Sequence, residues 1–372
     1  MKIIDVRWFP YCIPLCNGFS TAHGILTVRE GAIVEILTAE GMTGIGEIAP
    51  MPEFGGGNLP DALATLPRMR TLLQGKHLTE ALTLLYSEHT LPASAACGLE
   101  IALLDAQAQA KQLPLCELLA TNYANYEPAR SSVRVNTVIG AQSTEAAVTR
   151  AREAISAGFD CIKLKVGNDV TTDLERIAAI RETIGATTHL RLDANEAWTF
   201  DQALNVLQAC ACFNLQYVEQ PLSAHDLTGM HELRNAVTTP IAADEAVYNL
   251  ESARRILAAQ AADILIIKPQ LAGGLHVSQQ ITHEATEQHV QCVITSTIET
   301  GIGLAAVLHL AAALPEITLE CGLATLHLLT DDLLIDGLSI HEGSLSVPAG
   351  PGLGVRLDRE ALAKYTSFGS PN

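Results

Sequence analysis

The feature that most constrains the fold is a regular repeat that begins near residue 133. From there, eight short apolar runs alternate with amphipathic helical stretches. A polar residue stands near the end of each of the last seven runs, at steps of 28, 26, 25, 24, 28 and 24 residues. Each step matches the length of one strand, one helix and two loops. The seven residues are Lys165, Asp193, Glu219, Asp244, Lys268, Ser296 and Glu320.

This alternation predicts an α/β fold with a parallel sheet, and eight units predict that the sheet closes into a TIM-type barrel. The alternative is an open doubly wound sheet, which normally carries a glycine-rich phosphate-binding turn after an early strand. No such turn is evident in the sequence. TIM-type barrels keep their chemistry at the carboxyl ends of the strands, so the seven polar residues predict an active site there.

Residues 1 to about 125 have a different texture and predict an α+β unit. The segment GAIVEILTAEGMTGIGEIAP contains two strand-like runs that meet at Glu40 and Gly41, which is a hairpin signal. The segment SAACGLEIALLDAQAQAK, further along, has helical periodicity.

Composition indicates a compact globular protein, with 48% hydrophobic and 17% charged residues. The formal net charge of −18 argues against a partner that is nucleic acid or an anionic membrane. The longest apolar run is GIGLAAVLHLAAALP, which is short for a membrane span. An anionic small-molecule substrate must then be held by local cations or by a metal. Nothing in the sequence specifies an oligomeric state.

The nine cysteines are scattered without the spacing of a zinc site or a disulfide framework. We interpret them as reduced thiols of a cytoplasmic protein. The alternative interpretation takes two close pairs, Cys12 with Cys16 and Cys210 with Cys212, as metal ligands.

Three carboxylates stand at the ends of three successive strands, and we expect them to bind one divalent cation. Asp193, Glu219 and Asp244 would converge because adjacent strands lie only about 4.8 Å apart. Three like charges in a dry cavity repel, and a cation removes that repulsion. Hard oxygen ligands favour Mg²⁺, with Mn²⁺ as a possible substitute, over zinc. The alternative is a network of ion pairs between these carboxylates, the lysines and Arg191, without a metal.

Lysines flank these carboxylates on both sides along the predicted sheet. Lys163 and Lys165 lie two positions apart and must therefore share one face of their strand. We expect a cation and a second ammonium group to lower the pKa of Lys165 toward neutrality, which makes it a general base. Lys268, one strand beyond the carboxylates, would face Lys165 from the other side of the metal. Two bases and a metal suit removal of a proton α to a carboxylate through an enediolate.

Two further residues alternate with Asp193 and are predicted to support the site. Arg191 and Asn195 would hold the ligands or the substrate from the same strand face. Glu245 follows Asp244 directly, and strand alternation places it on the other face, so we do not expect it to be a ligand. Two alternatives to the enediolate mechanism remain: Lys268 as the Schiff-base nucleophile of an aldolase-type barrel, and a barrel without catalytic function.

Taken in order, five short segments resemble the enolase superfamily in its muconate-lactonizing-enzyme subgroup. The resemblance covers nearly the whole chain and implies a modified (β/α)₇β barrel at 126–339 under an α+β capping domain at 1–125, with residues from about 340 to 372 packing back on the cap. It also implies Mg²⁺ ligands at Asp193, Glu219 and Asp244, acid/base lysines at Lys165 and Lys268, and an auxiliary Lys163. The segments are KLK (163–165), DAN (193–195), EQP (219–221), ADE (243–245) and IKP (267–269).

Three longer segments look like the o-succinylbenzoate synthases of that subgroup: GIGEIAPMPEFG (44–55), STIETGIG (296–303) and GLATLHLLTDDL (322–333). The implied reaction is a Mg²⁺-dependent syn-dehydration of 2-succinyl-6-hydroxy-2,4-cyclohexadiene-1-carboxylate, a lyase step of menaquinone biosynthesis. Lys165 would take the α-proton and return it to the leaving hydroxyl, and Lys268 would stay cationic over the ring. The resemblance implies substrate contacts from Ser296, Thr297 and Glu299.

Other reactions of the subgroup remain as alternatives, because the chain departs from each pattern in places. N-acylamino-acid racemases usually show Gly-Gly-Met-x-Glu where this chain has 296–299. Dipeptide epimerases carry Asp-x-Asp where it has Glu320-Cys321-Gly322, and muconate cycloisomerases keep an acidic residue nearby. Segments 17–24 and 53–57 are expected to be lid loops over the barrel mouth, with Phe19 and Phe54 contacting the substrate ring.

Overall fold

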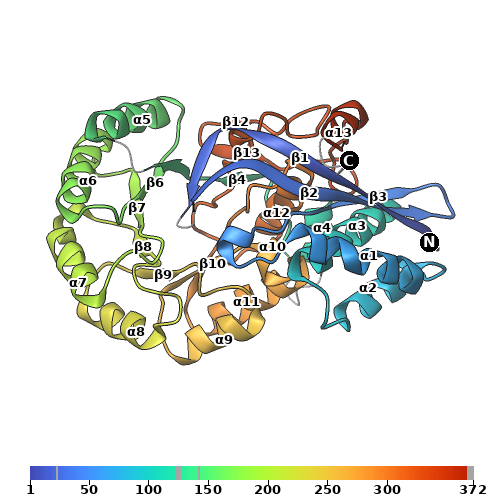
Figure 1. Cartoon of the computed structure of the whole chain (residues 1–372), viewed down its shortest axis with the longest axis horizontal. Coiled ribbons are helices and arrows are strands. Elements are labelled where there is room, and N and C mark those ends of the chain that lie inside the picture. The colour runs from blue at the N-terminus through green and yellow to red at the C-terminus, as the bar shows by residue number, and fades with distance from the viewer. Residues whose placement is uncertain (22–23, 122–126, 141–142, 367–372) are drawn as a thin grey trace.

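The structure is a computed structural model that describes residues 1–21, 24–121, 127–140 and 143–366, with only the backbone described at 19–21. Figure 1 shows two bodies side by side. One is an arc of helices around a curled sheet, and the other combines three long strands with four helices.

The N-terminal body is an antiparallel sheet backed by helices. Its strands pair in the order β1-β2-β3, and the β2–β3 connection passes through Glu40 and Gly41, so the predicted hairpin is confirmed. Helix α3 packs against β2 and β3. The elements are β1 (Ile3–Thr21), β2 (Gly24–Thr38), β3 (Thr43–Ile48), a 3₁₀ turn (Pro52–Phe54), α1 (Leu59–Leu73), α2 (Leu78–Tyr86), α3 (Ala93–Lys111) and α4 (Leu115–Ala120).

The second body is a seven-stranded parallel sheet in which the strands follow one another in sequence order, from β5 to β11. The strands are β5 (Thr137–Ile139), β6 (Cys161–Lys165), β7 (His189–Asp193), β8 (Tyr217–Glu219), β9 (Ile241–Ala243), β10 (Ile264–Ile267) and β11 (Gln291–Ile294). The helices between and after them are α5 (Thr144–Ser156), α6 (Val170–Ile184), α7 (Phe200–Ala209), α8 (Leu227–Ala236), α9 (Leu250–Ala258), α10 (Pro269–Ala272), α11 (Leu275–Glu287) and α12 (Gly301–Ala313).

The first and last predicted strands differ from the expectation. The first run divides into β4 (Ser132–Arg134), which leaves the barrel sheet, and β5. The last run forms no regular strand, but parallel bridges join Cys321 to Val135 and Gly322 to Thr295. This segment therefore lies between β11 and the start of β5 and closes the barrel, which confirms the predicted modified TIM barrel with an α+β cap.

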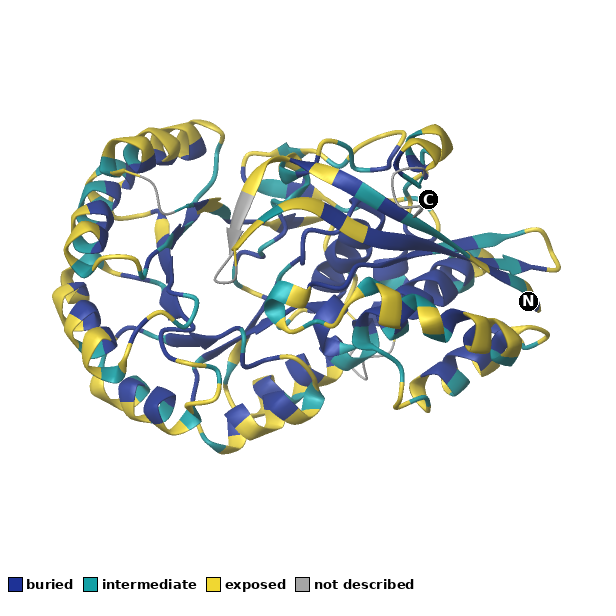
Figure 2. Cartoon of the chain, viewed as in Figure 1, coloured by how far each residue is buried: buried dark blue, intermediate teal, exposed yellow. Residues whose placement is uncertain are grey.

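Burial follows the predicted amphipathic patterns, as Figure 2 shows: the outer helices turn buried faces toward the strands and exposed faces outward. Like the four-residue α10, helix α12 is an exception, because every one of its residues is buried. It packs against α4 and β3 of the cap as well as α11 of the barrel. No helix in the described part of the chain is both long and apolar enough to cross a membrane.

The C-terminal segment returns to the N-terminal body. Strands β12 (Ile340–His341) and β13 (Ser344–Ser346) form a small antiparallel sheet with β4. Helix α13 (Arg359–Thr366) then packs against β1, and Arg359 forms an ion pair with Glu35 of β2.

Candidate active site

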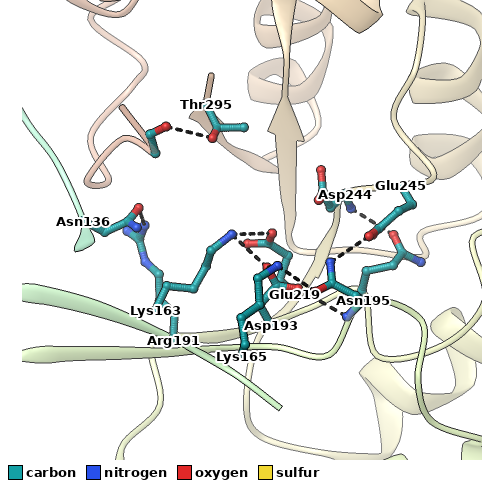
Figure 3. A network of polar contacts seen from close by, with 12 residues as sticks. Asn136, Lys163, Lys165, Arg191, Asp193, Asn195, Glu219, Asp244, Glu245 and Thr295 are labelled. Carbon is teal, nitrogen blue, oxygen red and sulfur yellow. Dashed lines mark hydrogen bonds and ion pairs between the residues drawn. The ribbon is translucent and has the colours of Figure 1, made fainter. Parts of the chain in front are cut away.

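Two lysines of β6 reach the same carboxylate at the mouth of the barrel. The Nζ atom of Lys163 lies 2.9 Å from Oδ2 of Asp193 and 2.7 Å from Oε1 of Glu219. The Nζ atom of Lys165 lies 2.7 Å from the same Oδ2 of Asp193. Figure 3 shows both side chains pointing to this carboxylate pair. Leu164, the one residue between the lysines, packs into the hydrophobic core, so strand alternation delivers two cations to one face.

The third lysine lies beyond the carboxylates along the series of strands, on the side away from Lys163 and Lys165. Lys268 follows β10 directly, and its Nζ lies 2.6 and 2.7 Å from the two carboxylate oxygens of Asp244. The ring of Phe54, from the capping domain, lies 4.6 Å from the same Nζ. Asp244 and Lys268 are both buried. The barrel thus presents two separate lysine–carboxylate groups, one on β6–β8 and one on β9–β10.

These contacts shift the pKa values of the carboxylates in opposite directions. Burial alone raises the pKa of Asp193, but Lys163 and Lys165 hold it below its ordinary value. Burial raises the pKa of Glu219, and repulsion from Asp193 and Asp244 raises it further. At Glu219, burial and the two neighbouring carboxylates together outweigh the attraction of the ammonium groups of Lys163 and Lys165.

The ammonium groups respond to the same charges. Burial by itself lowers the pKa of Lys163, but Asp193 and Glu219 hold it well above its ordinary value. Burial also lowers the pKa of Lys268, and the nearby carboxylates of Asp244, Glu245 and Glu219 together more than offset that effect. In this arrangement Lys163 and Lys268 are cations, so the lysines stabilise anions as well as being potential proton carriers.

An unpaired oxygen shows where a further cation would fit. The Oε2 atom of Glu219 is buried without a hydrogen-bond partner among the described residues. Carboxylate oxygens at successive strand ends are the donors that Mg²⁺ prefers. The described side chains include no group of three or more His, Cys, Asp or Glu already gathered closely enough to hold a metal. The other oxygens of the three carboxylates have partners, which are lysine ammonium groups or, at Oδ1 of Asp193, the backbone N–H of Asn195.

Arg191 lies one layer deeper in the barrel than the sequence predicts. Its guanidinium donates to Gln216 at 2.6 Å, to Asn136 at 3.1 Å and to Oε2 of Glu320 at 2.8 Å. Glu320 also contacts His189, at 2.8 Å. Arg191 therefore ties the closing segment to the sheet, and the expectation that it holds the carboxylates of the mouth is corrected. Alternation gave the face of the strand but not the depth along the barrel axis.

Asn195 and Glu245 both join the polar network at the mouth. The Oδ1 atom of Asn195 accepts a hydrogen bond from Lys165 at 2.6 Å, and its Nδ2 donates to Oε1 of Glu245 at 2.9 Å. The placement of Glu245 on the opposite face was wrong, because β9 ends at Ala243 and alternation stops there.

The proposed substrate contacts after β11 have mostly structural partners. Thr297 donates from its backbone and its hydroxyl to Glu299, and neither residue exposes any surface. The hydroxyl of Ser296 lies 2.8 Å from that of Thr325. The side chains of Thr297 and Glu299 therefore have partners within the protein, and substrate contacts from these residues stay a prediction. Phe54 lies at the site, beside Lys268, whereas the side chain of Phe19 is outside the described residues.

All nine cysteines have free thiols. Neither close pair belongs to a metal-binding cluster within the described residues.

Comparison with known proteins identifies the family. Residues 3–120 match the mandelate racemase / muconate lactonizing enzyme N-terminal domain, and residues 146–361 match the enolase C-terminal domain-like family. The chain therefore belongs to the enolase superfamily, and the predicted family is confirmed.

The similar proteins catalyse more than one reaction. The L-Ala-D/L-Glu epimerase of Bacillus subtilis is 32% identical over 95% of this chain and 97% of its own, and its substrate-liganded structure gives a TM-score of 0.88 at 31% identity, covering 95% of this chain and 99% of that one. A dipeptide epimerase from Enterococcus faecalis, complexed with Mg and L-Leu-L-Tyr, gives the same TM-score, identity and coverage. The o-succinylbenzoate synthase of Thermobifida fusca is 38% identical over 59% of this chain and 68% of its own.

Proposed function

We propose that the protein is a Mg²⁺-dependent o-succinylbenzoate synthase, which dehydrates 2-succinyl-6-hydroxy-2,4-cyclohexadiene-1-carboxylate. The proposal has a general part, abstraction of a proton α to a carboxylate, and a specific part, the substrate. The general part rests on Lys165, which contacts Asp193, and Lys268, which contacts Asp244, two of the three carboxylates at successive strand ends. Family membership supports it independently.

Asp193, Glu219 and Asp244 would hold the magnesium ion, and the unpaired oxygen of Glu219 is available to it. When bound, the ion supplies positive charge that stabilises an enediolate. Lys165 removes the α-proton from carbon, so that the C–H electron pair enters the ring system. The C–O bond then breaks, and Lys165 returns the proton to the leaving hydroxyl as water. Lys268 stays protonated, because Asp244 raises its pKa, and it stabilises the developing anion.

The observation that carries the specific part is the chemistry of the closing segment. A dipeptide carries an ammonium group, which needs an anion to hold it in a dry site. At the end of the barrel, Glu320 is already occupied by Arg191 and His189. Gly322 offers no side chain, and a Cβ there would lie 2.2 Å from Oγ1 of Thr295. This part of the site therefore favours a substrate without an ammonium group, as in the relative from Thermobifida fusca.

Dipeptide epimerisation is the second candidate, and near-full-length similarity to two epimerases favours it. An epimerase needs two groups that exchange protons on opposite faces of the α-carbon. Lys165, at the end of β6, and Lys268, directly after β10, are the groups that would take these roles.

One paired assay separates the candidates. The protein, with and without Mg²⁺, is incubated with the cyclohexadiene carboxylate, and in parallel with L-Ala-L-Glu in heavy water. We expect Mg²⁺-dependent formation of o-succinylbenzoate and little deuterium at the dipeptide α-carbon. Rapid deuterium incorporation into the dipeptide without dehydration would establish the epimerase instead.

A further inference from the structure

Glu245 is a half-buried residue beside the site, and the proposed mechanism assigns it no role. It follows Asp244 at the end of β9, and its Oε1 accepts a hydrogen bond from Nδ2 of Asn195 at 2.9 Å. The other end of the same amide, Oδ1 of Asn195, accepts from Nζ of Lys165 at 2.6 Å. Figure 3 shows the three side chains as a continuous line from β6 across β7 to the end of β9.

The amide can serve Lys165 in only one orientation. An ammonium group has donors alone, so it needs the oxygen of the amide, while a carboxylate needs the NH₂ group. If the amide turned over, its NH₂ group would face Lys165 and its oxygen would face Glu245, and both contacts would be repulsive. Glu245 therefore fixes which end of Asn195 meets the lysine.

The backbone holds Asn195 in the same place. Its N–H donates to Oδ1 of Asp193 at 3.2 Å, and its φ of 43° lies in the left-handed region, which asparagine tolerates better than most residues. Asp193 and Asn195 thus hold Lys165 from two directions, one through a charge and one through a neutral dipole.

The two lysines of the mechanism are held differently, and this difference suits different tasks. Lys268 contacts both oxygens of Asp244, which favours its protonated form. Lys165 contacts one oxygen of Asp193 and the amide oxygen of Asn195, so two different side chains orient its amine.

We propose that Glu245 is a positioning residue that acts through Asn195 to orient Lys165 as the base. The inference rests on the proposed function only for the name of the reaction, since both candidate reactions use Lys165. Asn195 would transmit the effect, and Glu245 would not itself touch the substrate or the metal.

The test is a double-mutant cycle on kcat with three variants, Glu245→Leu, Asn195→Ala and their combination. Misplacing a catalytic group can cost up to about 100-fold in rate, so we expect each single variant to lose about 30-fold in kcat with little change in KM. We expect the double variant to be no more than about threefold worse than either, because residues in one hydrogen-bonded chain are not additive.

Glu245→Gln should keep kcat within about fivefold, because its amide oxygen still accepts from Asn195. Exposed Glu232→Leu on α8 is the matched control for a glutamate-to-leucine change.

Two measurements distinguish positioning from other roles. Calorimetric titration should give the same Mg²⁺ affinity for Glu245→Leu as for the unchanged protein. A parallel loss of metal affinity would mean that Glu245 acts through Asp244, and additive losses in the cycle would mean that it does not act through Asn195. Either result overturns the proposal.

Crystal structures judge the proposal whichever substrate is turned over. The contact between Lys165 and Asn195 should persist in Glu245→Gln and be lost in Glu245→Leu. Its persistence in Glu245→Leu would overturn the proposal. Absence of dehydration and epimerisation in the unchanged protein would reject the proposed function, and the crystallographic contact would still decide this inference.

Discussion

Two groups of buried carboxylates in the described part of the chain differ in the hydrogen-bond donors that face them. The mouth group is Asp193, Glu219 and Asp244, which face lysine ammonium groups. The junction group is Glu47, Glu100 and Asp105 of the capping domain, which accept hydrogen bonds mainly from backbone N–H groups. Both groups lie almost entirely out of solvent.

The junction group joins the cap to the rest of the chain through helix ends and a returning segment. Glu47 accepts from the backbone of Thr300 at 2.9 Å and of Gly303 at 2.7 Å, at the start of α12. Glu100 accepts from Leu275 and His276 at the start of α11, at 2.6 and 2.9 Å. The first N–H groups of a helix have no partner within it, so these carboxylates satisfy them and complement the helix dipole.

The comparison shows that burial and acidity alone do not locate an active site. Backbone N–H groups neither give up nor accept a proton near neutral pH, so we assign the junction group a structural role. Ammonium groups can exchange protons. Their positive charge also offsets negative charge at a site that would hold a metal and an anionic substrate. The hydrogen-bond partner of a buried carboxylate, rather than the carboxylate itself, therefore distinguishes the catalytic group from the structural one.

The largest expected effect is on catalysis through the mouth group. Replacement of Lys165 or Lys268 by alanine should lower kcat by about 10³ to 10⁴-fold, within the range of a lost acid/base group. Steady-state kinetics give the rate, and circular dichroism checks that the variant is folded. A variant of Lys165 that keeps a tenth of the activity would remove it from the mechanism.

Glu47→Ala should show the opposite pattern, a loss of stability with a small loss of activity. Buried donors left without a partner cost about 1–3 kcal/mol each, so we expect the free energy of unfolding to fall by about 3–4 kcal/mol. Urea denaturation measures it, and exposed Glu40→Ala on the β2–β3 turn is the control. A stable Glu47→Ala protein that has lost all activity would erase the distinction between the two groups.

The junction group should also make stability depend on pH. Burial raises the pKa of Glu100 to about 7 and that of Asp105 to about 6. The folded state then binds more protons than the unfolded state between about pH 4 and 7, so stability falls as pH rises through that window. Each pKa unit corresponds to about 1.4 kcal/mol.

Glu100→Gln isolates this contribution. Urea denaturation at pH 5 and pH 8 should show that the unchanged protein loses about 1–3 kcal/mol more than the variant over this interval. Equal losses in both proteins would assign the pH dependence to other groups.

The smallest expected effect comes from a contact between the capping domain and the mouth group. Phe54 lies beside Lys268, and a cation–π contact of this kind contributes about 0.5–2 kcal/mol. Phe54→Leu should therefore lower kcat by about three- to tenfold without changing stability measurably. A change in melting temperature without a change in kcat would place Phe54 with the junction.

The sequence predicted the mouth group better than the junction group, for a physical reason. Lys165, Asp193 and Glu219 are the last residues of their strands, so a regular step along the chain becomes proximity in space. Glu47 meets Thr300 across 253 positions of the chain, and no local pattern encodes such a pair. The segment STIETGIG was recognised as distinctive, but its role as a docking point for Glu47 was not.

Errors within the mouth arose where regular strand geometry ended. Glu245 lies beyond the end of β9, so alternation did not apply to it. Arg191 lies inside β7 and faces the barrel interior, but two residues deeper than Asp193. Sequence periodicity gives the face of a strand, whereas the depth of a side chain in the barrel depends on register and closure.

Metal binding tests the central claim most directly, because the account requires one divalent ion at the mouth group and none at the junction group. Calorimetric titration with Mg²⁺ and Mn²⁺ should show one ion per chain in the unchanged protein and in Glu100→Gln. The same titration should show no binding in Asp193→Asn and Glu219→Gln. Undiminished binding in both mouth variants, or no binding in the unchanged protein, would contradict the account.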